Sequence, residues 1–423
     1  MNGKFITQKI VRLCAQPRTF DFLCKNMDGL DPIRINEALQ ELETSQAIHF
    51  KNNLWATNDH GKHPTLGFET HDPLLYLKKY MGYFEFLKTP HPLDFEWRNS
   101  TASLNYLNNL VQELNGINDN VLYLGMPTLF ATSYLKDLPH KVTLVERNKP
   151  IIEGLQKLVS NNQRFIIRSA DIFKVNPKKI GQHHCVIMDP PWYSQIFKQF
   201  MWLACQCVEI GGIVGISMPP LSTKNDILDE RLEWIKFCHD QGLCIEYLRP
   251  QQLHYAMPFF EFNALRAAGV QGFPPFWRKG DLVIFRKICE RTTARPELDA
   301  IMPDWDEVEI DSVKIRVFND NNKVTKAPLE IQHLIKTDIL PNVSKSDPKR
   351  KEANVWTSGN RIFRVNDTAT FIRLLREVKV GRKYHNKEEQ IVSHFVEQVT
   401  SLEKKEFEQY LQWLYYEMER QID

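Results

Sequence analysis

Short apolar runs alternate with helical segments over residues 118–290, and this alternation constrains the fold more than any other feature. Each run has the length of a buried strand, and the segments between the runs are long enough for helices. The predicted strands are Val121–Leu124, Val142–Val145, Phe165–Ile167, Cys185–Met188, Ile213–Ser217, Ile245–Tyr247 and Leu282–Phe285. Strands that alternate with helices form a mainly parallel sheet covered on both faces. The pattern therefore predicts an α/β sheet of seven strands with a hairpin-like pair at its end.

Residues 1–60 have the pattern of a winged-helix domain. Its predicted helices cover residues 6–14, 19–26 and 32–45. The third helix begins well, because Asp31 can act as its N-cap and Pro32 suits its first turn. A β-hairpin is expected around Asn52 and Asn53, since asparagine tolerates the positive φ of a tight turn. Helix-turn-helix modules often bind nucleic acid, but basic and acidic side chains nearly cancel here, so a packing or protein-contact role stays open.

The rest of the chain divides into a lead-in, the sheet and an extension. Residues 61–117 are expected to form a linker with helical stretches at Pro73–Phe86 and Ser100–Asn115. Residues 118–290 hold the sheet. Residues 291–423 are expected to form a C-terminal α+β extension, because strand-like and helical patterns follow one another there.

The extension has three recognisable segments. Asp311–Asn319 alternates like an exposed strand. The terminal helix carries an apolar stripe formed by Leu402, Tyr410, Leu411, Leu414 and Met418. Between Lys345 and Glu388, twelve Lys or Arg residues stand against five Asp or Glu residues. Such an excess indicates either a surface for nucleic acid or a solvated basic face.

Composition excludes several classes of protein. The chain has 423 residues, 43% hydrophobic content and a net charge of +2, as expected for a globular protein of two or three domains. Its eight cysteines include no Cys-x-x-Cys pair, which argues against a zinc site and favours a reducing compartment. The N-terminus lacks the apolar core of a signal peptide, and no 18-residue apolar stretch occurs. We therefore expect a soluble, cytoplasmic protein with no metal centre and no membrane partner.

A motif directly after the fourth predicted strand carries the most chemical information. Asp189, Pro190, Pro191, Trp192 and Tyr193 combine a carboxylate, two prolines and two aromatic side chains. The carboxylate and a nearby backbone carbonyl can accept hydrogen bonds from an amino group, and the prolines keep these acceptors in place. Trp192 offers a flat face for a planar base. We predict that the first four residues are catalytic in transfer of a group to an amine nitrogen and that Tyr193 contacts the substrate.

The ends of the first three predicted strands supply candidates for a nucleotide-type cofactor site. Gly125 permits close backbone approach after the first strand, although the loop lacks a glycine-rich pattern. Glu146 ends the second strand, where an acidic side chain can accept hydrogen bonds from both ribose hydroxyls of an adenosine group. Asp171 follows the third strand and can accept from an adenine amino group, with Ile172 against the ring, or else act as a helix N-cap. Ligands of open α/β sheets bind at this edge, so we expect these residues to lie together.

These segments resemble, in their order, the N6-adenine methyltransferase-like family, which includes elongation-factor lysine methyltransferases and an rRNA adenine methyltransferase. Besides the Asp-Pro-Pro-Trp motif, the resemblance rests on Phe95–Ala102, Met126–Phe130, Arg249-Pro250 and Phe259–Asn263. It covers about residues 92–287, less than half of the chain. In that family the Asp-Pro-Pro-aromatic motif serves both nucleic-acid adenines and protein lysines, so the motif identifies the reaction and not the acceptor.

The resemblance implies a class I methyltransferase-type, Rossmann-like sheet and S-adenosylmethionine as the cofactor. The residues it implies for cofactor binding are Gly125, Glu146 and Asp171, and we add Pro127 of the first loop and Ile172 as further candidates for this site. It implies Asp189, Pro190, Pro191 and Trp192 for the active site. Phe260 and Asn263, in the late substrate-side segment, are candidates for substrate binding together with Tyr193.

Four functions remain open, and we favour the first. It is methylation of an adenine or cytosine amino group, most of all adenine N6, in DNA or RNA, which Trp192, the winged helix and the basic stretch support. The second is protein lysine methylation on the same scaffold. The third is aminopropyl transfer, because branched-chain polyamine synthases also join a winged helix to such a sheet; those enzymes hold their amine with an acidic cluster, which is missing beside Asp189. The fourth is a non-catalytic scaffold, against which the retained Glu146 and Asp189 argue. We therefore expect nucleic acid as the partner, with a protein substrate as the alternative.

Overall fold

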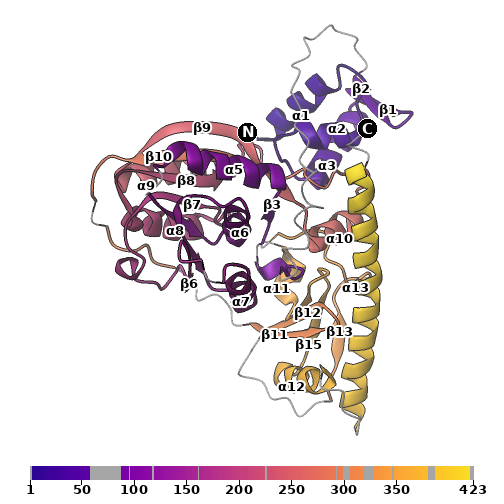
Figure 1. Ribbon diagram of the computed structural model, residues 1–423. Helices are drawn as coiled ribbons and strands as arrows, with labels where there is room; N and C mark the ends of the chain where they lie inside the picture. Colours follow the sequence, from indigo (N-terminus) through magenta and orange to yellow (C-terminus); the bar gives the residue numbers. More distant parts are fainter. Residues whose placement is uncertain are drawn as a thin grey trace. The chain divides into compact units, whose positions relative to one another are not determined.

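Two large β-sheets, besides a two-stranded hairpin, organise the part of the chain that the structure describes (Figure 1). The computed structural model describes residues 2–57, 87–94, 96–116, 119–160, 162–223, 226–291, 293–298, 305–318, 328–344, 347–379 and 386–419. The predicted helix at Pro73–Phe86 and residue Phe95 lie outside these ranges, as does the side chain of Met418. No helix within the described residues is both long and apolar enough to cross a membrane.

Each sheet belongs to its own compact unit. The first unit takes its described residues from Met1–Leu87, Arg98–Ala256 and Gly272–Leu298, and the second from Lys88–Trp97, Met257–Gln271 and Asp299–Asp423. The chain therefore contributes two short internal segments, 88–97 and 257–271, to the second unit. The sequence predicts domains that follow one another along the chain, without such internal segments. Local sequence patterns carry no information on which distant segments pack together.

The sheet of the first unit has the strand order β3-β9-β10-β8-β7-β4-β5-β6. Its strands are β3 (Arg98–Asn99), β4 (Asn120–Leu124), β5 (Lys141–Glu146), β6 (Phe165–Ser169), β7 (His183–Met188), β8 (Val208–Met218), β9 (Leu243–Ala256) and β10 (Lys279–Lys287). Strands β4 to β8 pair in parallel, whereas β10 is antiparallel to both of its neighbours. Each of the seven predicted strands lies within one of β4 to β10. The short edge strand β3 was not predicted.

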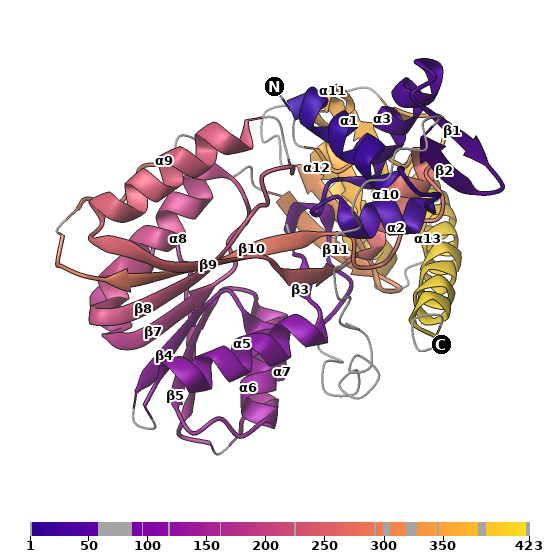
Figure 2. The ribbon, with the colours of Figure 1, turned by 90° about the horizontal axis from the view of Figure 1, so that it is seen from above.

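Helices cover both faces of this sheet, as the alternating pattern predicts. Figure 2 shows α5, α6 and α7 on one face and α8 and α9 on the other. Their bounds are α5 (Thr101–Leu114), α6 (Pro127–Leu135), α7 (Lys149–Leu158), α8 (Ser194–Cys207) and α9 (Ile227–Asp240). Side-chain caps and proline define where they begin: Ser100 caps α5, Asn148 caps α7, and Pro127 stands in the first turn of α6. The α/β prediction for this region is confirmed.

The N-terminal segment of the first unit contains three helices and a hairpin, as predicted from its sequence. They are α1 (Asn2–Leu13), α2 (Phe20–Asn26), α3 (Pro32–Thr44), β1 (Ile48–Lys51) and β2 (Leu54–Thr57). The Asp31 carboxylate accepts a hydrogen bond from the backbone N–H of Ile33 (2.8 Å) and so caps α3. Asn52 and Asn53 form the hairpin turn with φ of 53° and 61°, values that asparagine tolerates. The comparison with winged helices stays an interpretation of this order of elements.

The second unit is built on a five-stranded sheet with the order β11-β12-β14-β15-β13. Its elements are α10 (Phe259–Ala267), β11 (Trp305–Ile310), β12 (Val313–Phe318), β13 (Ile331–His333), α11 (Pro348–Glu352), β14 (Val355–Thr357), β15 (Ile362–Val365), α12 (Thr368–Lys379) and α13 (Lys387–Glu419). Its main core combines apolar side chains of the sheet with those of α12 and α13. The exposed strand expected at Asp311–Asn319 is wrong over its described residues: β12 is largely buried, because Val313, Ile315 and Val317 pack into this core.

The stripe predicted on the last helix is also wrong in part. Tyr410 is buried, but Leu402 is 49% exposed. The buried positions of α13 include Val392, Phe395, Val396, Val399, Glu403 and Tyr410. They follow the three- and four-residue spacing of one helix face, which Leu402 misses by one position. Glu403 therefore occupies a place where an apolar side chain is expected.

The basic stretch at residues 345–388 is not one continuous solvated face. Several of its arginines bind within the second unit: Arg361 to Glu406, Arg373 to Glu377, Arg376 to Asp306, and Arg350 over the ring of Trp356. These contacts engage four of the twelve Lys and Arg residues of the stretch. The stretch therefore supports a nucleic-acid surface less than its composition suggests.

Candidate active site

The parallel strands of the first unit end side by side, which brings the predicted site residues to one edge of the sheet. The register pairs Leu124 with Met188 and with Val145, and Glu146 with Ser169. Gly125, Glu146, Asp171 and Asp189 stand at or just beyond these strand ends. This edge is the C-terminal edge of β4, β5, β6 and β7, where open α/β sheets bind their ligands.

Asp189 is held by two neutral hydrogen-bond donors. The Tyr255 hydroxyl donates to its Oδ1 (3.0 Å), and the Asn99 side-chain amide donates to its Oδ2 (3.3 Å). Burial raises the pKa of Asp189 to about 6, while the bonds from Tyr255 and Asn99 act in the opposite direction. The carboxylate is thus mostly ionised at neutral pH and can still take up a proton near that pH.

Pairing of distant strands places these two donors. Asn99 on β3 and Tyr255 on β9 are directly opposite each other, so their side chains share one face of the sheet. The Tyr255 oxygen also lies 2.5 Å from the Ser217 hydroxyl on β8. Because Tyr255 donates its one proton to Asp189, Ser217 is the donor in that bond. The Ser217 and Tyr255 hydroxyl groups meet across β10 at Gly280. A Cβ atom at this position would lie 2.6 Å from the Ser217 oxygen and 3.0 Å from the Tyr255 oxygen, so the glycine leaves room for their contact.

The same cluster has acceptor capacity left over. Asn99 is 9% exposed, and its Oδ1 is buried with no hydrogen-bond partner. A buried carbonyl oxygen without a partner costs free energy, which a donor brought by a substrate would offset. An ionised carboxylate has about four lone-pair positions, of which Tyr255 and Asn99 use two at Asp189. Asp189 and Asn99 together therefore suit a group that donates N–H bonds.

Trp192 lies beside this cluster with one face covered. Its ring meets Tyr255 edge-on, with centroids 5.9 Å apart. The Arg278 guanidinium stands over the Trp192 ring, 4.6 Å from the centroid, and its charge also lowers the pKa of Asp189. The predicted stacking face is thus occupied by a planar cation, which is itself a good partner for an aromatic ring.

The cofactor candidates form a second group along the edge. Gly125 has φ of 64°, a conformation that glycine adopts readily, and its N–H donates to Val145 (3.0 Å). The Cβ that Gly125 lacks would lie 3.8 Å from Ile172 and 3.6 Å from Phe200, so apolar side chains border this loop. Pro127 opens α6 immediately after it.

The two acidic candidates both organise their own loops. Glu146 Oε1 accepts hydrogen bonds from the backbone N–H groups of Arg147 (2.8 Å) and Asn148 (2.9 Å). Asp171 Oδ1 accepts from the N–H of Phe173 (2.9 Å). Asp171 therefore closes a turn and does not cap a helix, since the next helical element begins at Pro177, and its Oδ2 is left as the oxygen for a ligand. Carboxylates at the ends of β5 and β6, with an apolar border at Gly125 and Ile172, fit the hydroxyl and amino groups and the ring of an adenosine.

Two predicted substrate residues are placed elsewhere. Phe260 and Asn263 lie on α10 of the second unit and are 2% exposed. Asn263 donates to the Gly359 carbonyl (3.0 Å) and to Glu406 (3.3 Å), and Phe260 packs edge-on with Trp97. The structure thus gives both side chains interior partners within that unit. Tyr193 is half-buried just before α8, next to the motif as expected.

Sequence reasoning missed four residues of the cluster: Asn99, Ser217, Tyr255 and Arg278. Asn99 stands in a stretch that supported the family resemblance, but nothing in that stretch indicated contact with Asp189. Ser217 lies on β8, Tyr255 lies on β9 and Arg278 directly precedes β10, and no local motif marks these three residues. Only the pairing of β3 with β9 and the glycine at position 280 could have indicated the cluster.

Comparison with known proteins shows the fold. The branched-chain polyamine synthase from Thermus thermophilus, solved with N4-aminopropylspermidine and 5′-methylthioadenosine, is 16% identical with a TM-score of 0.55, over 70% of this chain and 90% of that chain. A mutein of that enzyme gives 14% and 0.56 over the same shares. A putative RNA methyltransferase from Pyrococcus horikoshii is 17% identical with a TM-score of 0.36, over 50% of this chain and 98% of that chain.

No protein-family model matches the sequence, and neither does any curated protein. The likeness to solved structures is at low identity and therefore concerns the fold alone. Together with the strand order, it shows a Rossmann-like α/β fold shared with the branched-chain polyamine synthase. The chemistry has to be argued from the residues at the sheet edge.

Proposed function

We propose that this protein transfers a methyl group from S-adenosylmethionine to an amino nitrogen, in the manner of the N6-adenine methyltransferase-like family. The observation that carries the proposal is the Asp189 carboxylate at the end of β7, held by Tyr255 and Asn99 on the same sheet edge as Gly125 and Glu146. When bound, the cofactor would supply an electrophilic methyl group on a sulfonium. Glu146 would hold its ribose, Asp171 its adenine amino group, and Ile172 its ring.

Asp189 and its neighbours would orient the acceptor. Two N–H groups of an amine can be accepted by Asp189 and by the Asn99 oxygen or the Pro190 carbonyl, which leaves the nitrogen lone pair directed at the methyl group. The N–CH₃ bond forms as the S–CH₃ bond breaks, and the electron pair of that bond stays on sulfur. The nitrogen then loses a proton, for which the ionised Asp189 is a base in hydrogen-bond contact.

Trp192 and Arg278 favour a nucleobase as the acceptor over a free polyamine or a lysine. A planar base can replace or extend the stack of the Arg278 guanidinium on Trp192, and the positive charge suits a nearby phosphate. The same charge repels a polycation. Adenine N6 in DNA or RNA is therefore the acceptor we favour, and protein lysine is the alternative within the same reaction.

The N-terminal helices would support this part of the site. Lys279, next to Arg278, donates to the Lys25 carbonyl (2.6 Å), and the Arg278 charge lowers the pKa of Asp31, which burial raises overall. We infer that this winged-helix-like segment holds Arg278 in place and lies where an acceptor strand would approach.

A second candidate is aminopropyl transfer, since the structure shares its fold over 90% of the length of a branched-chain polyamine synthase. A polycationic amine needs a group of carboxylates to hold it. Among the described residues, the side chains that shift the pKa of Asp189 are Tyr255, Asn99, Ser217 and Arg278, and none of these four is an acid. We therefore place this function second.

The deciding experiment has two stages. Calorimetric titration with S-adenosylmethionine and with decarboxylated S-adenosylmethionine identifies the donor: tighter binding of the first supports methyl transfer, and tighter binding of the second supports aminopropyl transfer. Binding of neither would remove both proposals and support a scaffold.

Methyl-labelled cofactor incubated with cellular RNA, DNA and protein then identifies the acceptor class. The proposal expects label in a nucleic-acid fraction and about threefold less with Arg278→Met, which keeps much of the side-chain volume without the charge. Label in protein alone would make lysine the acceptor.

A further inference from the structure

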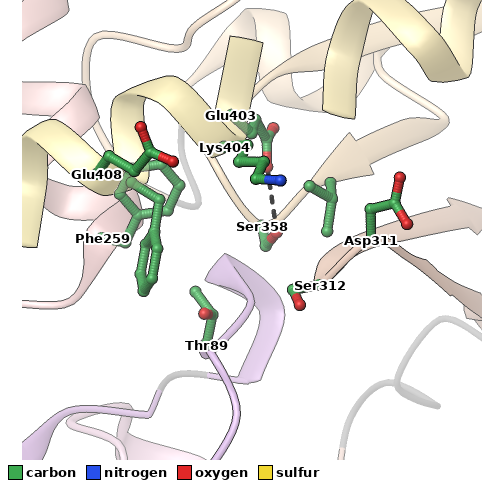
Figure 3. A pocket seen from close by; sticks show the side chains of 10 residues that line it. Thr89, Phe259, Asp311, Ser312, Ser358, Glu403, Lys404 and Glu408 are labelled. Carbon is green, nitrogen blue, oxygen red and sulfur yellow. Dashed lines mark hydrogen bonds between the residues drawn. The ribbon is translucent and has the colours of Figure 1, made fainter. Parts of the chain in front are cut away.

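The second unit contains a cavity of about 500 Å³ that the proposed reaction does not use. Figure 3 shows the side chains that line it. They include two aromatic residues, Phe259 and Phe407, and four charged ones, Asp311, Glu403, Lys404 and Glu408. A concave space of this size with an apolar wall and a few polar groups is typical of small-ligand sites.

Glu403 is the buried acidic side chain among the residues that line this cavity. It is 1% exposed, and the hydroxyl of Thr357 donates to its Oε1 while that of Ser358 donates to Oε2 (3.2 Å). Gly359 makes room for it, because a Cβ there would lie 2.5 Å from the Glu403 carboxyl carbon. The hairpin between β14 and β15 is thus fitted closely around one carboxylate of α13.

The charge of Glu403 is not balanced within its surroundings. Arg361 is the nearest cation, but its guanidinium is engaged by Glu406 through two bonds of 2.7 Å and 2.6 Å and lies 3.7 Å from Glu403 Oε1. Two carboxylates therefore share one guanidinium. Burial raises the pKa of Glu403 to about 7, and the charge of the shared Arg361 acts in the opposite direction without offsetting it.

The rest of the lining determines which ligand could supply the missing charge. Asp311 and Glu408 are exposed and add two negative charges, against one positive charge from Lys404. This balance disfavours an anion. A metal ion is disfavoured too, because no group of three or more His, Cys, Asp or Glu side chains suited to a metal occurs among the described residues. Phe259 and Phe407 pack edge-on at 5.2 Å and provide an apolar wall.

We propose that this cavity binds an aliphatic primary amine as its ammonium cation, with the charged end at Glu403 and the hydrocarbon stem against Phe259 and Phe407. The ammonium would balance the buried carboxylate, and the aromatic rings would contact the stem and attract the cation. The site would serve either a free amine or the side chain of a lysine residue, since the two share this chemistry.

Calorimetry on the full chain tests the proposal at pH 8, where Glu403 is ionised. The background is Asp189→Ala, so that an amine bound at the proposed acceptor site does not contribute. The probes are n-pentylamine as a free amine, Nα-acetyl-lysine N-methylamide as a lysine residue, and n-pentanol as a neutral isostere. We expect at least one amine to bind and n-pentanol to bind at least tenfold more weakly.

Three charge variants and one matched control locate the binding. Glu403→Gln is expected to weaken amine binding by about tenfold, because a buried carboxylate is lost. Glu408→Lys at the exposed mouth is expected to weaken it about threefold, and Lys404→Gln to strengthen it by a smaller factor. Glu397→Gln, an exposed site on the same helix outside the cavity lining, is expected to change nothing.

Equal binding of n-pentanol and the amines would overturn the proposal, and so would failure of both amines to bind. Equal effects of the Glu403 and Glu397 substitutions would do the same. Should the Glu403 variant fold poorly, the opposite signs expected at Glu408 and Lys404 still decide the question, since both residues are exposed. None of these outcomes depends on the methyl-transfer proposal.

Discussion

Asp189 in the first unit and Glu403 in the second are both carboxylates whose pKa burial raises, to about 6 and about 7. Their surroundings differ in kind. Asp189 follows a strand, is fixed by two prolines and receives bonds from neutral donors. Glu403 stands on a helix at a position of the apolar stripe, beside an arginine that a second carboxylate already engages.

The difference shows how a buried charge can serve two purposes. At Asp189 the neighbours leave acceptor atoms unused, including the buried Asn99 oxygen, so a hydrogen-bond donor of a ligand can bind there. At Glu403 the neighbours leave the negative charge only partly balanced, so a cationic ligand can bind there. The first arrangement suits chemistry on an amine nitrogen, and the second suits binding of an ammonium group without reaction.

The largest expected effect is on transfer by Asp189→Ala. Loss of the carboxylate removes both the acceptor for the amine and the base, so the single-turnover rate of label transfer should fall by about 10³-fold. The exposed Glu397→Gln variant should keep the wild-type rate. A rate within tenfold of wild type for Asp189→Ala would show that the reaction occurs elsewhere.

Asp189→Asn separates the two roles of the side chain. It keeps one acceptor oxygen but cannot take up a proton near pH 6. Activity above that of the alanine variant, with no decline below pH 6, would mean that accepting hydrogen bonds is the main role. Activity as low as that of alanine would assign the main role to the base.

The next effect concerns stability and the Glu403 side of the comparison. The folded-state pKa of Glu403, about 7, exceeds the ordinary value of 4.5. Protonation of Glu403 therefore stabilises the folded state fully below pH 4.5, and this stabilisation is lost as the pH rises through 7. The free energy of unfolding of wild type, relative to Glu403→Gln, should fall by about 3 kcal/mol from pH 4 to pH 8. Urea unfolding at both pH values measures this, and a pH-independent difference would contradict it.

A smaller effect is expected from Tyr255→Phe, which removes one donor to Asp189. Transfer should fall about tenfold, as is common for a lost hydrogen bond to a charged group. Because the Tyr255 bond lowers the Asp189 pKa, its removal should also move the acid limb of the pH–rate profile from about 6 to a higher pH. An unchanged acid limb would show that another group controls it.

Much of the first unit could be predicted from sequence, because local patterns determine it. The alternation of apolar runs marks the central strands, and the Asp189 motif marks the end of β7. The predicted strand at Ile245–Tyr247 is much shorter than β9, which reaches Ala256 through polar residues. Pairing with β10 stabilises the extended part of β9 and also brings Tyr255 to the site. Such pairing between distant segments leaves no local signal.

The second unit could be predicted far less well for the same reason. Its polar interior, such as Glu403 with Thr357, depends on contacts between a hairpin and a helix that are far apart in the chain. An acidic residue on a helix is normally interpreted as exposed, and the Leu402 stripe followed from that assumption. The family resemblance predicts a substrate site for Phe260 and Asn263 because it compares positions along the sequence. It gives no information on the unit in which these residues fold.

Binding of S-adenosylmethionine to three proteins tests the central claim most directly, because it does not require the acceptor to be known. Calorimetric dissociation constants for wild type, Glu146→Gln and Asp189→Ala are measured in one buffer at pH 7.5. The account predicts measurable binding to wild type, about tenfold weaker binding to the Glu146 variant, and binding to the Asp189 variant within about threefold of wild type. No binding to wild type, or equal affinity of the Glu146 variant, would contradict a cofactor site at this edge of the sheet.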